Sequence, residues 1–435
     1  MRIASRPAAR DRLEAALAGI ADPQGEGART YLTLYTDEAR KAADASDARA
    51  RAGAALGPLD GTIISIKDLF DVAGEPTRAG SRILADAPPA HADATVVTRL
   101  RQAGAVIVGK TNMVEFAFSG VGLNPHYGTP RNPADRACVP GGSTSGGGVA
   151  VADGLCEIAI GTDTGGSTRI PAALCGVVGF KPSQSRVPRD GVFPLSRALD
   201  SIGPIARSVA ACALADAVMA GEAPTALEPA ALAGLKFGIP QGLPLVDLDQ
   251  TVAVRFAQAI GLIGRSGGTL SDETFGLLDD MAKVNSPVPL VTVEAFAVHR
   301  EWLAAHGPDY DPLVRARIEA ASGISAQEHA AMLRARAALV KAMDARLANL
   351  DVLVLPTTPI VAPTLAEVAT ADGFAARNRL LLRNTAIANF FDLCAISLPL
   401  PRAGGLPTGL MLVARNGQDR RLLQIALAVE TRLRE

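Results

Sequence analysis

Apolar residues in the first part of the chain recur at the spacing of a helix. Residues 7–21 carry an apolar stripe, and residues 36–55 form an alanine-rich segment with mixed charges. Both patterns predict helices, because a period near 3.6 residues gathers apolar side chains on one face. The period then changes, and residues 62–67 form a short apolar run that predicts a β-strand.

Strands and helices alternate along the rest of the chain. The patterns predict helices over 94–103, 210–220, 251–263 and 418–434, and strands over 105–109, 235–240, 351–356, 395–398 and 410–413. Residues 290–347 are helical in pattern almost throughout, with breaks at Gly307-Pro308 and Gly323. No linker or internal repeat divides the chain. We therefore expect a single compact α/β domain over residues 1–435, with a helical insertion at about 290–347.

The overall composition indicates a globular chain without a basic excess. Of its 435 residues, 48% are hydrophobic, and 43 lysines and arginines nearly balance 44 aspartates and glutamates. A disordered chain would be poorer in apolar residues, and a nucleic-acid-binding chain would carry excess positive charge. We therefore expect neither disorder nor a nucleic acid partner.

Membrane, secretory and metal-binding classes have little support. Charges interrupt the apolar stretch at the N-terminus, unlike a secretory leader, and no apolar run approaches the roughly 18–20 residues of a membrane span. The histidines form no HxxxH or HExxH motif, and the five cysteines show no CxxC spacing; they are Cys138, Cys156, Cys175, Cys212 and Cys394. We expect a cytoplasmic protein with free thiols and no metal site.

Two serine-containing loops stand out where the glycines are densest, between residues 120 and 180. The first spans 140–148 (PGGSTSGGG) and the second 161–171 (GTDTGGSTRIP). Consecutive glycines permit positive φ angles and bring backbone N–H groups close to a ligand. A serine beside such amides is well placed to be a nucleophile with an oxyanion hole.

Ordinary functions of glycine-rich loops compete with this interpretation. A phosphate-binding loop would read GxxxxGK[ST], which neither loop does, and the nearby Lys181 lies outside both. A dinucleotide fingerprint would need a preceding strand and a later acidic residue, which are missing. The loops could also be structural turns, so catalytic and non-catalytic interpretations both stand on these residues alone.

A serine nucleophile needs a base, and Lys67 is the candidate. No histidine lies in either loop, whereas Lys67 ends the apolar run 62–66. A lysine at a strand end ordinarily reaches solvent or pairs with a carboxylate, here Asp68 or Asp71. A desolvated lysine would instead be neutral and able to accept a proton. Ser65, on the same strand face, is a weaker alternative partner.

One match to a nucleophile motif is rejected. Residues 264–268 (GRSGG) satisfy GxSxG, but that motif must connect a strand to a following helix. Here the preceding pattern is helical, so these glycines predict the C-terminal end of a helix.

Long motifs around the two loops resemble the amidase signature family of amide hydrolases. They are GGSTSGGG and GTDTGGSTRIPAALCGVVGFKPS within 140–183, GTIISIKDLFDVAG at 61–74, KTNMVEF at 110–116 and NPHYG at 124–128. The similarity is strong over about residues 55–210 and returns near 388–400 and in the last helix. The resemblance implies a three-layer α/β/α domain with a central mixed β-sheet.

The resemblance also implies a Ser–Ser–Lys triad. Ser167 matches the acylated nucleophile, Ser143 the bridging serine in a cis peptide bond, and Lys67 the base. The backbone amides that match the oxyanion hole are those of Thr164, Gly165, Gly166 and Ser167. This chemistry needs no cofactor. The chain departs from the common GGSSGGS pattern at Thr144 and beyond, and this leaves the triad positions in place.

Three functions are compatible with the sequence. The first is a free-standing amidase that hydrolyses a small-molecule carboxylic amide to the acid and ammonia or an amine; the resemblance suggests a homodimer. The second is the A subunit of a tRNA-dependent amidotransferase, which hydrolyses glutamine and passes ammonia to a partner. The third is a non-catalytic metabolite-binding protein that uses the glycine-rich loops.

The sequence does not identify the amide. Specificity is expected in residues 290–347 and in the loop after Ser183. The run Phe116-Ala117-Phe118 either borders the substrate's acyl group, with Ala117 as a contact, or belongs to the core. Asp163 and Arg169 predict an ion pair that braces the second loop, with a contact from Arg169 to a substrate carboxylate as the alternative.

Overall fold

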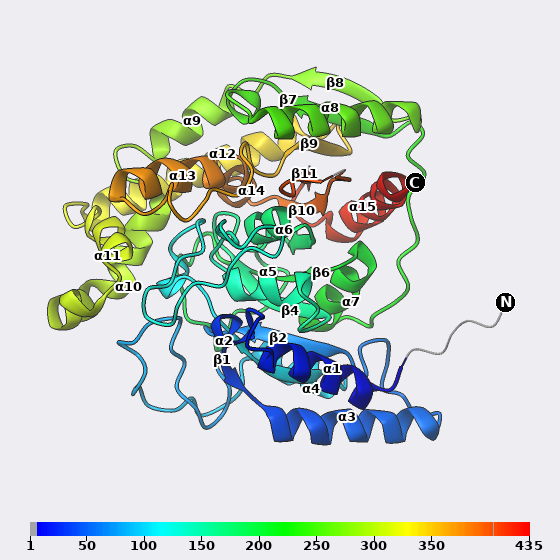
Figure 1. The fold of residues 1–435 in the computed structure, drawn as a ribbon. Coiled ribbons are helices and arrows are strands. Elements are labelled where there is room, and N and C mark those ends of the chain that lie inside the picture. Colours follow the sequence, from blue (N-terminus) through cyan, green and yellow to red (C-terminus); the bar gives the residue numbers. More distant parts are fainter. Residues whose placement is uncertain (1–6, 403) are drawn as a thin grey trace.

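A single large sheet runs through the computed structural model, which describes residues 7–402 and 404–435 (Figure 1). Its strands are β1 (Tyr31–Leu34), β2 (Ile63–Lys67), β3 (Val106–Thr111), β4 (Ile158–Asp163), β5 (Val178–Lys181), β6 (Ser201–Ala206), β7 (Lys236–Pro240), β8 (Thr269–Glu273), β9 (Val352–Pro356), β10 (Cys394–Pro399) and β11 (Gly409–Ala414). Their spatial order is β1-β3-β2-β4-β6-β5-β10-β11-β9-β7-β8. Strand β2 is parallel to β3 and β4, whereas β4 is antiparallel to β6. The sheet is therefore mixed, as predicted.

Helices cover both faces of this sheet and give the three predicted layers. One face carries α1 (Ala9–Ala21), α3 (Thr36–Arg51), α5 (Ser145–Ala152), α6 (Arg169–Cys175), α9 (Leu277–Val284), α12 (Ala326–Arg346) and α14 (Thr385–Phe390). The other carries α4 (Thr95–Gln102), α7 (Val209–Ala220), α8 (Gln250–Arg265) and α15 (Asp419–Arg434). The remaining elements are α2 (Gly27–Thr30), α10 (Leu290–His306), α11 (Pro312–Glu319), α13 (Ala371–Arg383) and the short 3₁₀ turns η1 (Glu115–Ala117), η2 (Leu243–Leu245) and η3 (Gly307–Asp309).

The alternation of side chains along β2 decides where Lys67 points. Ile64 and Ile66 enter the core beneath α4 and α7, and Ile63 enters the opposite core beneath α1 and α5. Because successive strand residues face opposite ways, Lys67 lies on the same face as Ile63, the face that α5 and α6 cover. The parallel strands β2 and β4 end side by side, and this brings Lys67 close to the start of the second glycine-rich loop.

The helical predictions match the structure closely, and the predicted insertion consists of α10, η3, α11 and α12. Strands β1, β4, β5, β6 and β8 were not predicted, because glycine and polar residues interrupt or flank their short apolar runs. All five cysteines are free and buried. Among the described helices, none combines the length and the apolar character that crossing a bilayer requires.

Candidate active site

Lys67 lies at the centre of a fully buried polar site. Its side chain is 0% exposed at the end of β2, all five residues of which are buried. The ammonium nitrogen Nζ donates hydrogen bonds to Ser143 Oγ at 2.8 Å and to Thr162 Oγ1 at 2.9 Å. Both partners are neutral hydroxyls, and Lys67 forms no ion pair with any residue in the described part of the chain. The predicted pairing with Asp68 or Asp71 is therefore absent, and Ser65 instead contacts Cys156.

This environment favours the neutral amine. Burial lowers the pKa of Lys67 from its ordinary value to about 7, against the opposing influence of the Asp163 and Asp200 carboxylates. Removal from water penalises the charged ammonium more than the neutral amine. A large share of the Lys67 side chains is therefore unprotonated near neutral pH and able to accept a proton.

Ser143 is fixed by its backbone as well as by the hydrogen bond that its side chain accepts from Lys67. The Gly142–Ser143 peptide bond is cis, as the resemblance implies. The Ser143 carbonyl accepts a hydrogen bond from the Val114 N–H at 3.1 Å, and the Gly142 N–H donates to the Gly120 carbonyl at 2.8 Å. A Cβ atom at Gly142 would lie only 2.9 Å from the Gly122 nitrogen, so only glycine fits there. The segment around η1 thus clamps the first loop.

Ser167 lies in the second loop, and a backbone contact joins the two loops. The Thr144 N–H donates to the Ser167 carbonyl at 3.3 Å, and Ser167 itself is buried. Gly166 has φ +138°, a conformation that side-chain-bearing residues rarely adopt. The N–H groups of Gly165, Gly166 and Ser167 donate to no acceptor among the described residues. Free amides beside a serine are the arrangement that an oxyanion hole requires.

Thr164, the remaining one of the four predicted oxyanion-hole residues, is held by its side chain. Its hydroxyl donates to Asp200 Oδ1 at 2.5 Å, and Asp200 also accepts from the N–H groups of Leu195 and Ser196 at 3.0 Å. Burial raises the pKa of Asp200 to about 6, although these hydrogen bonds oppose the shift. Asp200 therefore connects the loop after Ser183 to the residue that starts the candidate oxyanion hole.

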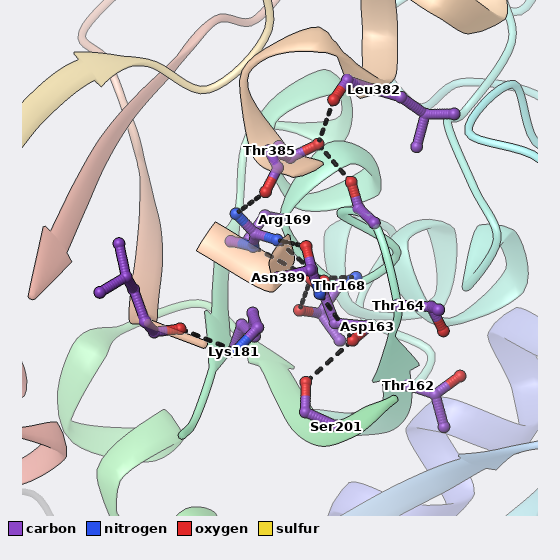
Figure 2. A network of polar contacts seen from close by, with 12 residues as sticks. Thr162, Asp163, Thr164, Thr168, Arg169, Lys181, Ser201, Leu382, Thr385 and Asn389 are labelled. Atoms are coloured by element: carbon purple, nitrogen blue, oxygen red, sulfur yellow. Dashed lines mark hydrogen bonds and ion pairs between the residues drawn. The ribbon is translucent and has the colours of Figure 1, made fainter. Parts of the chain in front are cut away.

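Arg169 and Asp163 form the predicted ion pair behind the second loop (Figure 2). Two guanidinium nitrogens reach the Asp163 carboxylate at 2.8 and 3.0 Å. The other N–H groups reach the Thr385 carbonyl, Asn389 Oδ1 and the Met411 sulfur, and Arg169 is 0% exposed. A guanidinium has five N–H donors, and all five are engaged within the protein. Arg169 is thus a structural residue with no donor left for a substrate carboxylate.

The same network fixes the loop backbone and the charge on Asp163. Thr385 donates to the Gly165 carbonyl at 2.6 Å, and Asn389 donates to the Asp163 carbonyl at 3.0 Å. Burial alone would raise the pKa of Asp163, but the adjacent Arg169 guanidinium outweighs it and holds that pKa well below its ordinary value. Asp163 is therefore an ionised carboxylate that is paired with Arg169.

The run Phe116-Ala117-Phe118 is buried in η1 and its C-terminal cap. Phe116 and Ala117 have positive φ angles of 50° and 61°, which are uncommon outside glycine. Phe116 packs into a cluster of aromatic rings, and the Phe118 ring lies 4.5 Å from the Arg317 guanidinium carbon. The run is therefore core on one side and borders charged and aromatic groups of the insertion on the other.

Two predictions about the loops have clear outcomes. Ser266 of the rejected GxSxG motif caps the C-terminus of α8, and its hydroxyl donates to the Leu262 carbonyl. Thr144, where the chain departs from the common pattern, packs against Gly161, where an added Cβ would lie 2.6 Å from the threonine side chain. Thr162, Asp200 and Arg317 were not predicted as site residues. Thr162 falls within the glycine-rich sequence 161–171 and lies near the end of β4, whereas Asp200 and Arg317 carried no local signal.

Comparisons with known proteins decide the family. The model of the Amidase family matches residues 20–423. The chain belongs to the amidase family.

Relatives of this amidase include both hydrolases and components of amidotransferases. It is 37% identical over 424 residues to the 2-amino-5-chloromuconic acid deaminase of Comamonas testosteroni, covering 92% of this chain and 87% of the relative. It is 36% identical over 462 residues to the A subunit of the glutamyl-tRNA(Gln) amidotransferase of Anaeromyxobacter dehalogenans, covering 97% and 92%. The structure of a peptide amidase from Stenotrophomonas maltophilia superposes with a TM-score of 0.81 at 30% identity, covering 98% and 94%. The amidase is thus a hydrolase of carbon–nitrogen bonds.

Replacement of Arg169 by methionine tests its structural role in the amidase. Arg169→Met leaves the Asp163 carboxylate buried without its partner, so the free energy of unfolding should fall by about 3–5 kcal/mol. Chemical denaturation measures this loss. Arg300→Met, which changes an arginine whose side chain is 68% exposed, is the matched control and should be nearly neutral. Unchanged stability together with a raised KM for acidic amides alone would contradict the structural role.

Proposed function

We propose that this chain is a free-standing amidase that uses Ser167 as nucleophile, Ser143 as proton relay and Lys67 as base. The observation that carries these three catalytic roles is the 2.8 Å hydrogen bond between Lys67 Nζ and Ser143 Oγ in a fully buried site. Lysine is an effective base only when desolvated, and this lysine is. The buried free cysteines support a reducing compartment, so we place the enzyme in the cytoplasm.

The proposed reaction proceeds through an acyl-enzyme. Neutral Lys67 takes a proton from Ser143 while Ser143 takes one from Ser167, whose oxygen then attacks the amide carbonyl carbon. The tetrahedral oxyanion accepts hydrogen bonds from the free amides of Gly165, Gly166 and Ser167; one such donor is worth about 10²–10³ in rate. The relay returns its proton to the leaving nitrogen as the carbon–nitrogen bond breaks. Water then hydrolyses the ester and releases the acid.

Covalent trapping tests the nucleophile. Wild-type enzyme treated with a fluorophosphonate should gain one phosphonyl group on Ser167, located by peptide mass spectrometry. Ser167→Ala should abolish labelling and lower kcat by about 10³-fold or more, because removing the nucleophile removes the covalent route. Ser266→Ala removes the rejected GxSxG serine and is the control. Labelling that persists in Ser167→Ala, or moves to Ser266, would exclude the proposed nucleophile.

The unpaired charge of Arg317 favours an amide that carries a carboxylate as the substrate. Its guanidinium has no carboxylate partner among the described residues, and its enclosed Nε makes no hydrogen bond there. Burial lowers the pKa of Arg317 to about 10, so the group remains charged at neutral pH. A half-buried cation without a counterion is costly, and a substrate carboxylate would supply the missing partner. The name of the Comamonas relative also denotes an acid as its substrate.

The selectivity of the enzyme for amides with a carboxylate over neutral amides tests this role of Arg317. Arg317→Gln should lower kcat/KM for amides that carry a carboxylate by roughly 10- to 100-fold, because a charge-assisted hydrogen bond is lost. Neutral amides of the same size should be hardly affected. The matched control is Arg315→Gln on the same helix, because Arg315 is already paired with Glu319. Equal losses for charged and neutral amides would show that Arg317 is only structural.

The amidotransferase alternative is supported by the relative from Anaeromyxobacter and predicts a need for partner subunits. Ammonia release from small amides by the purified chain alone favours the free-standing enzyme. Activity confined to glutamine and dependent on added partner subunits would favour the alternative.

A further inference from the structure

Aromatic rings are scarce in this chain, yet five rings gather at one place beside η1. The sequence has one tryptophan, four tyrosines and twelve phenylalanines. We use the name aromatic cluster for Phe116, Phe193, His299, Trp302 and Tyr310. Ring centroids lie 4.3 Å apart for Phe116 and His299, 5.6 Å for Phe193 and Trp302, and 5.3 Å for Phe116 and Tyr310.

The aromatic cluster joins the regions in which specificity was expected. Phe193 belongs to the loop after Ser183, and His299 and Trp302 belong to α10 of the insertion. Phe116 lies in η1, two residues after Val114, whose N–H binds the Ser143 carbonyl. Phe116 of the cluster is therefore connected to the proposed proton relay through two residues of backbone and one hydrogen bond.

His299 gives the aromatic cluster an unsatisfied polar atom. The ring is 0% exposed, and its Nδ1 lies 3.0 Å from the Tyr310 hydroxyl, whereas Nε2 has no hydrogen bond partner among the described residues. Burial lowers the pKa of His299 to about 4, so the imidazole is neutral at physiological pH. If Tyr310 donates to Nδ1, only one hydrogen, on Nε2, lacks an acceptor. The other tautomer would leave both the tyrosine hydrogen and the Nε2 lone pair unmatched, so we assign the hydrogen to Nε2.

The rings of the aromatic cluster differ in their exposure to solvent. Phe116 and Tyr310 are buried, whereas Phe193 and Trp302 are half-buried and stack at an interplanar angle of 23°. A buried donor without an acceptor costs free energy, and an acceptor on a bound ligand would offset that cost. Flat aromatic walls around one polar group are instead typical of a ligand subsite.

We infer that the aromatic cluster is the subsite for a planar, unsaturated part of the amide substrate, with His299 Nε2–H donating to an acceptor on that group. The inference rests on the proposed function only in placing this subsite beside Ser143. It concerns shape and unsaturation, whereas the proposed role of Arg317 concerns charge, so the two can fail separately.

The single tryptophan gives a direct binding readout, because Trp302 lies in the aromatic cluster. The probes are terephthalamate and trans-4-carbamoylcyclohexanecarboxylate, which share an amide and a carboxylate and differ in a planar against a saturated ring. Both are titrated against Ser167→Ala, and Trp302 fluorescence is followed. Terephthalamate should bind about tenfold more tightly and change the emission, because ring stacking is lost with the saturated ring.

Variants show which residues produce this preference for the planar ring. In the Ser167→Ala background, Phe193→Leu should reduce the preference for the planar ring to about twofold or less, because it removes one aromatic wall while keeping an apolar side chain. Glu301→Ala, which changes an exposed neighbour of Trp302 on α10, should leave the preference intact. Arg317→Gln should weaken both probes equally and leave their ratio unchanged.

A second pair of probes tests His299. Isonicotinamide adds a ring-nitrogen acceptor to benzamide, so it should bind more tightly than benzamide by roughly three- to tenfold. His299→Phe should abolish this difference while keeping the preference for planar rings.

Three results would overturn the inference. They are equal affinities for the planar and saturated probes, no saturable change in Trp302 emission with any probe, and a Phe193→Leu variant that loses thermal stability but keeps the full preference. Hydrolysis of terephthalamate by Ser167→Ala would instead contradict the proposed nucleophile, so that failure is recognisable on its own.

Discussion

Burial of Lys67 against two hydroxyls is the constraint on which the rest of the site depends. An amine removed from water and given no carboxylate partner loses much of its tendency to hold a proton. The largest opposing influence on the pKa of Lys67 is the Asp163 carboxylate, which favours the charged ammonium. Arg169 occupies that carboxylate through two hydrogen bonds, and Asn389 adds a third. The ion pair therefore does more than brace a loop: it occupies the carboxylate that would otherwise favour the charged form of Lys67, as the proposed role of Lys67 as a base requires.

The glycines explain how a serine pair can stand over this lysine. At Gly142 and Gly166 a side chain would collide with neighbouring backbone or with Thr385, so the two loops approach each other and their supports closely. The N–H groups of Gly165, Gly166 and Ser167 are left free while Thr385 holds the Gly165 carbonyl and Asp200 holds the Thr164 side chain. Backbone held in this way is preorganised for developing negative charge, which is where an amidase gains most of its rate.

Much of the fold and the central residues could be predicted from sequence, but their surroundings could not. Regular apolar periodicity predicted most helices and strands such as β3, β9 and β11, whereas β4 and β5 lie in glycine-dense sequence where periodicity is weak. Lys67 was recognisable because it ends an apolar strand, although the roles of Ser143 and Ser167 rested on resemblance. Asp200, Arg317 and His299 gave no signal, because an unpaired guanidinium or imidazole nitrogen is defined only by partners that lie far apart in the sequence.

The most direct test of this account is the pH dependence of Ser167 phosphonylation by an uncharged fluorophosphonate, which reports on the free enzyme. Protonation of Lys67 blocks the relay, so the second-order rate constant should be level above neutrality and fall tenfold per pH unit below an apparent pKa near 7. In Asp200→Asn the same fall in rate below neutrality should persist with a slightly lower apparent pKa, because a carboxylate that favours the ammonium is gone. An apparent pKa near 10, which is typical of an ordinary lysine, would contradict the account. A pH dependence that disappears in Asp200→Asn would also contradict it, because Asp200 and not Lys67 would then be the titrating group.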